Sequence, residues 1–126
     1  MENTNNYIPG VCNIGKEEIN KRRQSGIVGL ILTVLTYSLF VYFDVYKGIR
    51  FLTSVPAVIS AIGFLQARMH FCVYYGLAEM FNFDSLGKSS KVENDEFVRK
   101  DKKRARSMIY ISVLIGIVVG LLAVIV

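Results

Sequence analysis

Three blocks of apolar residues alternate with polar segments along the chain. The first block, 26–43, and the last, 108–126, contain no charged side chain, whereas the middle block, 51–77, carries Arg68 and His70 toward its end. A helix that crosses a bilayer needs about 20 predominantly apolar residues, and each block supplies them. The pattern predicts an all-α integral membrane protein with three transmembrane helices rather than a soluble domain.

The polar segments divide the 126 residues into parts of a single membrane domain. Gly15 is placed to cap a helix that begins near Lys16, with Glu18 in its first turn, so the first helix should start before the membrane. After residue 93, acidic residues precede basic ones, an order that suits a helix leading into the third span. The predicted parts are an N-terminal segment at 1–15, a helix with span 1 at 16–43, span 2 at 51–77, a basic cytoplasmic loop at 78–107 and span 3 at 108–126.

Basic residues gather at one end of the predicted spans. Lys and Arg number 15 against 10 Asp and Glu, which gives a formal net charge of +5. They concentrate before span 1 and between spans 2 and 3, while Lys47 and Arg50 are the cations between spans 1 and 2. Because basic residues close to spans stay in the cytoplasm, we expect the N-terminus inside and the C-terminus outside. This placement explains the charge without a nucleic-acid partner.

Several of these cations are placed to meet the anionic headgroups of the lipid bilayer. Arg68 lies late in span 2, from which its long side chain reaches the headgroup level. A basic run directly precedes span 3, where each cation attracts anionic lipid by about 1 kcal/mol. The predicted headgroup contacts are Arg68, Arg99, Lys100, Lys102, Lys103, Arg104 and Arg106.

Small residues recur at helical spacing within each span. Such stripes let helix backbones approach closely in lipid, where hydrophobic burial does not drive association. The stripes could pack against one another within the chain, against other membrane subunits, or against a second copy in a homo-oligomer. The predicted helix-packing residues are Gly26 and Gly29 in span 1, Ser60, Gly63 and Ala67 in span 2, and Ser112, Gly116 and Gly120 in span 3.

One group of side chains has the chemistry of a cofactor site. His70, Cys72 and Cys12 all map to the cytoplasmic side, where thiols stay reduced, and they could bind haem or a transition metal. Against this, His70 and Cys72 point to nearly opposite sides of a helix, and a closed zinc site needs four ligands. The alternative is that His70 bonds to Gln66 or to the N-terminal segment, and that Cys72 packs as a small apolar residue. We expect no cofactor, no metal and no catalytic residue.

Two stretches, YIPGVCNIGKEEI and GFLQARMHFCVYYGL, resemble a group of small bacterial three-span membrane proteins with a VCNIG-type N-terminus. The resemblance favours a multi-pass protein of the bacterial inner membrane. That group has no established activity, so the resemblance implies no substrate or cofactor. It does imply one shared feature on the cytoplasmic side, made by Cys12, Asn13, Gly15, Gln66, Arg68 and Cys72.

Together these patterns favour association over catalysis. The chain contains no nucleotide-binding loop and no acidic residue within a span, which argues against an enzyme and against proton transport. We expect a non-enzymatic accessory or assembly subunit of a larger membrane complex, or a homo-oligomeric bundle. The alternative is a membrane-bound redox or metal-binding protein that uses His70 with Cys72 or Cys12.

Overall fold

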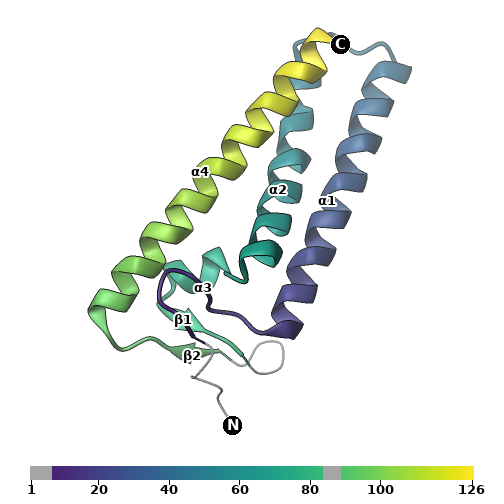
Figure 1. Cartoon of the computed structure of the whole chain (residues 1–126). Helices are drawn as coiled ribbons and strands as arrows, with labels where there is room; N and C mark the ends of the chain where they lie inside the picture. Colours follow the sequence, from purple (N-terminus) through teal and green to yellow (C-terminus); the bar gives the residue numbers. More distant parts are fainter. Residues whose placement is uncertain (1–6, 84–88) are drawn as a thin grey trace.

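The computed structural model describes residues 7–83 and 89–126, and most of them are helical. Three helices are long and apolar enough to cross a membrane, at Lys16–Tyr42, Ile49–Met69 and Asp95–Ile125. The prediction of a mostly helical fold with three helices able to span a membrane is therefore confirmed. The elements in Figure 1 are the helices α1 (Lys16–Tyr42), α2 (Ser54–Met69), α3 (Val73–Leu77) and α4 (Asp95–Ile125), the 3₁₀ helix η2 (Ile49–Thr53), and the short strands β1 (Met80–Phe81) and β2 (Ser90–Lys91).

The three long helices lie in a row rather than in a closed bundle. Helix α2 stands between α1 and α4, as Figure 1 shows, and both outer helices pack along it. The outer helices scarcely touch each other. At the end of the row where α1 begins, α3 and the antiparallel pair β1–β2 form a small polar base.

Helices α1 and α2 approach closely because small residues line their contact. A Cβ atom added to Gly63 would lie 2.6 Å from the backbone nitrogen of Gly26, and one added to Gly29 would lie equally close to that of Ser60. The Ser60 hydroxyl donates a 2.9 Å hydrogen bond to the carbonyl oxygen of Gly26. A side chain at either glycine would therefore push the two helices apart.

Helix α4 turns its own small-residue stripe toward α2. A Cβ atom added to Gly120 would lie 2.8 Å from the Phe51 ring, and one added to Gly116 would overlap the Val58 side chain. Ser112 is fully buried on the same stripe. The stripe is therefore used within the chain, which removes it as a surface for self-association.

Helix α2 ends earlier than the predicted span at 51–77. His70 adopts the left-handed conformation (φ 53°, ψ 39°), and the amide of Phe71 then bonds to the carbonyl of Gln66 at 3.1 Å. The chain turns toward α4, where Phe71 and Val73 pack in one apolar cluster with Ala105 and Met108. The span prediction was wrong beyond Met69, because apolar residues that bury against α4 carry the same hydropathy as residues that face lipid.

Helix α4 joins two parts that the sequence divided at residue 107. It runs unbroken from the basic segment into the apolar one, as the order of acids and bases predicted. Asn94 caps it, since its side-chain oxygen accepts hydrogen bonds from the amides of Glu96 and Phe97 at 2.9 and 3.3 Å. Helix α1 begins at Lys16 after Gly15, as predicted.

We predict that Gly63→Ala destabilises the contact between α1 and α2. The added methyl group meets backbone rather than a flexible side chain, so we expect a loss of about 1–3 kcal/mol in the free energy of unfolding. Thermal unfolding in mild detergent, followed by circular dichroism, measures it. The matched control is Gly48→Ala, because the added methyl group there meets the exposed ring of Tyr46, which can move. Equal melting temperatures for both variants would contradict the prediction.

Candidate functional site

The N-terminal segment 7–15 closes the end of α2 through the amide side chain of Asn13. This side chain is fully buried and faces the chain just after the helix ends. Its Nδ2 donates to the carbonyl of Cys72 at 3.2 Å, and its Oδ1 accepts from the amide of Cys72 at 2.7 Å. The backbone amide of Asn13 donates to the carbonyl of His70 at 3.1 Å. One asparagine thus bonds three backbone groups of the chain that directly follows α2.

The same segment pairs with the chain that follows β1. The amide of Asn82 donates to the carbonyl of Asn13 at 2.9 Å, and the amide of Gly15 donates to the carbonyl of Asn82 at 2.8 Å. Between these bonds Ile14 packs in an apolar cluster with Cys72 and Tyr75. The segment is therefore part of the folded base.

A buried polar cluster, made of Glu18, Arg22, Cys72, Tyr75 and Asn82, lies beside this pairing. Glu18 is 1% exposed, and its carboxylate forms an ion pair with Arg22 at 3.1 Å. The Tyr75 hydroxyl and the Asn82 side-chain amide donate to Glu18 at 3.2 and 3.3 Å. Arg22 also donates to the Cys72 sulfur at 2.9 Å. These bonds compensate a buried charge, which indicates a structural role for the cluster.

A second buried acid ties the N-terminal segment to α4. The hydroxyl of Tyr7 and the amide of Gly10 donate to the Asp101 carboxylate, the latter at 2.7 Å. Arg104 donates to the carbonyl of Gly10 at 2.8 Å. Burial and the hydrogen bond to Asp101 raise the pKa of the Tyr7 phenol, so it remains a donor at neutral pH. The ring of Tyr7 stacks on Phe81 with 5.0 Å between centroids.

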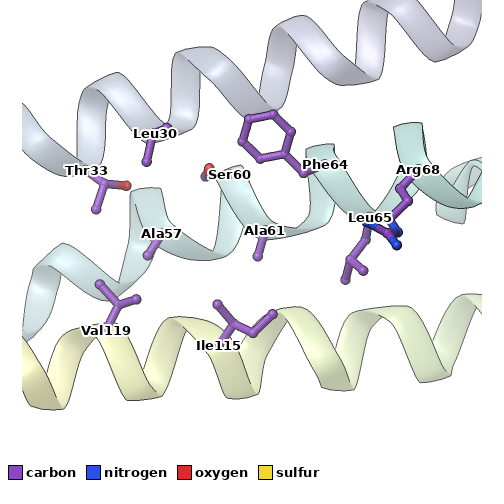
Figure 2. Close-up of a pocket in the computed structure, with 10 residues that line it drawn as sticks. All are labelled: Leu30, Thr33, Ala57, Ser60, Ala61, Phe64, Leu65, Arg68, Ile115 and Val119. Atoms are coloured by element: carbon purple, nitrogen blue, oxygen red, sulfur yellow. The ribbon is translucent and has the colours of Figure 1, made fainter.

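An apolar groove runs between α1 and α4 along α2, because the outer helices do not meet. Its inner pocket, near the base, has a volume of about 390 Å³, and Figure 2 shows the side chains around it. An outer pocket of about 320 Å³ shares Thr33 and Val119 with it and continues the groove toward the C-terminal end of α4. The inner pocket is lined by Leu30, Thr33, Ala57, Ser60, Ala61, Phe64, Leu65, Arg68, Ile115 and Val119.

Arg68 is the charged residue of the inner pocket. Its side chain lies beside Leu65 at one end of the pocket, as Figure 2 shows. The hydroxyls of Thr33 and Ser60 are already bonded to the carbonyls of Gly29 and Gly26 at 2.7 and 2.9 Å. Arg68 forms no hydrogen bond or ion pair with residues 7–83 or 89–126. The groove therefore presents apolar surface and one available cation.

The predicted cofactor residues do not converge on one point. His70 and Cys12 line the same shallow hollow, whereas Cys72 is fully buried with its sulfur bonded to Arg22. Burial raises the pKa of the Cys12 thiol, which disfavours the thiolate that binds metals. The Gln66 side chain does not bond to His70 as predicted; its Oε1 accepts a hydrogen bond from the amide of Val73 at 2.9 Å. Within the described ranges, no three His, Cys, Asp or Glu side chains group as metal ligands.

The predicted headgroup residues divide into two sets. Three of them have partners inside the protein: Lys100 pairs with Glu96 at 3.7 Å, Lys102 pairs with Glu79 at 3.2 Å, and Arg104 bonds to Gly10. The other basic residues of α4 are exposed, namely Arg99, Lys103 and Arg106.

The feature implied by the resemblance is brought together in part. Hydrogen bonds at the base involve Asn13, Gly15, Gln66 and Cys72. Cys12 lines the hollow beside His70, and Arg68 lies in the groove. Sequence reasoning missed Glu18, Arg22 and Asp101 as buried groups. The spacing of Glu18 and Arg22, four residues apart on a helix, was a signal for their ion pair.

No protein-family model, curated protein or solved structure matches this chain.

We predict that Asn13→Ala exposes Cys72 by releasing the N-terminal segment. The substitution leaves the buried backbone amide of Cys72 without its partner, which costs about 1–3 kcal/mol, while the carbonyl of Cys72 keeps its bond from the amide of Gly76. In a Cys12→Ser background, maleimide should label Cys72 slowly, because that side chain is 0% exposed, and Asn13→Ala should raise the rate about tenfold or more. The matched control is Asn20→Ala, which changes an exposed asparagine on α1. Unchanged labelling in Asn13→Ala would show that the segment closes the base by other contacts.

Proposed function

We propose that this chain is an integral protein of the bacterial inner membrane with three spans, the N-terminus in the cytoplasm and the C-terminus outside. The three long helices have the length and hydropathy for this role. The start of α1 and the end of α4 lie at opposite ends of the row in Figure 1.

The charge distribution supports this orientation. The base carries the basic start of α1 and the basic part of α4. At the other end, Arg50 is buried, donates to the carbonyl of Val45 at 3.1 Å and pairs with Asp44 at 3.6 Å. Lys47 is the other cation at that end, so most of the Lys and Arg residues lie at the base, the end that the positive-inside rule assigns to the cytoplasm.

We further propose that the protein is a non-enzymatic accessory or assembly subunit of a larger membrane complex. The observation that carries this proposal is the open row, in which the outer helices pack against α2 and η2 rather than against each other, and broad apolar faces stay uncovered. The hydrogen bonds at the base also favour a structural role, because Asn13, Glu18 and Asp101 bond within the chain. The geometry supports association better than chemistry on a bound substrate.

Labelling with a membrane-impermeant maleimide tests the orientation. In intact bacterial cells that express a Val126→Cys, Cys12→Ser variant, we expect the new cysteine to react, because it lies at the outer end of α4. Cys12 in the otherwise unchanged chain should react in inverted vesicles and not in intact cells. The reverse pattern would overturn the proposed topology.

Extraction from native membranes tests the accessory role. After solubilisation in a mild detergent, we expect the tagged chain to elute with a heavier partner, because the chain itself does not bury the apolar faces of the row. Mass spectrometry of that fraction separates a different subunit from a second copy. A parallel extraction in dodecyl sulfate is the control in which the partner is lost. Recovery of a single, isolated chain in the mild detergent would count against the proposal.

A further inference from the structure

The inner pocket combines an apolar lining with a cation at one end. Arg68 has no partner among residues 7–83 and 89–126, and the pocket hydroxyls bond to the backbone of α1. An occupant that matches this pocket has one anionic group and one apolar chain. A purely apolar helix would offer no counterion to the guanidinium, whereas an anionic lipid supplies one.

Arg68 stands level with the first cations of α1. Gly26 packs against Gly63 where these antiparallel helices cross. The number of residues from Gly63 to Arg68 on α2 equals the number from Gly26 to Lys21 on α1. Since both helices rise equally per residue, Arg68 and Lys21 lie at the same height. Because Lys21 precedes the apolar part of α1, the guanidinium lies near the depth of the lipid phosphates.

The contact between α2 and α4 places Arg68 at the same height along the row. Gly116 packs against Val58, and the number of residues from Val58 to Arg68 on α2 equals the number from Gly116 to Arg106 on α4. Arg106 immediately precedes the apolar part of α4. Two independent helix contacts thus place Arg68 at the boundary between the basic and the apolar zones.

The length of the inner pocket matches one lipid chain. Its lining on α2 extends from Arg68 to Ala57, roughly 17 Å at about 1.5 Å per residue. One leaflet contributes about half of the hydrocarbon thickness of roughly 30 Å. An acyl chain that begins at Arg68 therefore reaches Ala57 near the middle of the bilayer.

We propose that the inner pocket is a binding site for an anionic phospholipid of the cytoplasmic leaflet, with one acyl chain in the groove and its phosphate on Arg68. A guanidinium bonds two phosphate oxygens at once, so it binds this group with defined geometry. The proposal rests on the membrane location proposed above and is independent of the accessory role. The site should prefer anionic over neutral phospholipids without distinguishing among anionic headgroups, because the lining offers no further available polar group at the headgroup end.

Tryptophan fluorescence tests the site, since the chain contains no tryptophan of its own. Ile115→Trp puts a single reporter in the pocket lining, and the neighbouring Leu114→Trp puts one on exposed surface outside it. Both are reconstituted in phosphatidylcholine vesicles with increasing amounts of phosphatidylglycerol that has brominated chains. We expect the pocket tryptophan to be quenched at about tenfold lower phosphatidylglycerol content than its neighbour. Equal quenching curves would overturn the proposal.

Two arginine variants separate the site from general surface charge. In the Ile115→Trp background, Arg68→Gln should lower the quenching by brominated phosphatidylglycerol to the level seen with the exposed reporter. Arg106→Gln removes a cation at the same height and should leave the quenching of the pocket tryptophan unchanged. An equal loss in both variants would overturn the assignment to Arg68. Brominated phosphatidylcholine should give no preference, because it carries no net negative charge.

Two further measurements distinguish other occupants. Added inorganic phosphate should not restore the emission of Ile115→Trp, because the acyl chain holds the lipid; recovery would point to a soluble phosphate and overturn the lipid site. Ala61→Phe fills the pocket and should halve or abolish lipid retained by detergent-purified protein of unchanged helicity. If this variant keeps the lipid but loses a co-purifying protein, the groove holds a partner helix instead. Loss of lipid with the partner still bound leaves the accessory role intact.

Discussion

The fold depends on how the chain is bonded where α2 ends. A helix end leaves backbone groups without partners, and those that are buried need partners within the chain. The left-handed turn at His70 closes part of α2, and the Asn13 side chain bonds both backbone groups of Cys72. Because Asn13 belongs to the N-terminal segment, satisfying this helix end also folds the first residues of the chain onto the base.

The position of that segment then determines the neighbouring charges. Because Gly15 bonds to Asn82, α1 begins next to the chain that follows β1, and Glu18 in its first turn lies in the interior. The buried carboxylate is compensated by Arg22, Tyr75 and Asn82. The base is thus a continuous set of hydrogen bonds in which each buried polar group orients the next. Such a set gives the base a defined geometry, because hydrogen bonds are directional and apolar packing is not.

The sequence could predict the parts of the structure that follow from local pattern. Apolar blocks gave the three long helices, and the spacing of Gly26, Gly29 and Gly116 indicated where backbones approach. The end of α2 at Met69 could not be predicted from hydropathy, because Phe71 and Val73 are as apolar as residues that face lipid. The burial of Glu18 and Asp101 depends on partners that are distant in sequence, and hydropathy assigns both acids to water.

The three long helices form an open row because the small residues that pack each outer helix against α2 are not available for contact between the outer helices. Glycines let α1 and α4 sit very close to α2, but each outer helix uses its small-residue stripe for α2 and presents larger side chains elsewhere. The outer helices therefore cannot close on each other, and a groove remains between them over the small residues Ala57, Ser60 and Ala61. In water such a groove would collapse or aggregate, whereas in a bilayer it is filled by a chain or a helix. The way this protein packs its own helices leaves a place for another molecule, and that is the physical reason to seek its function in association.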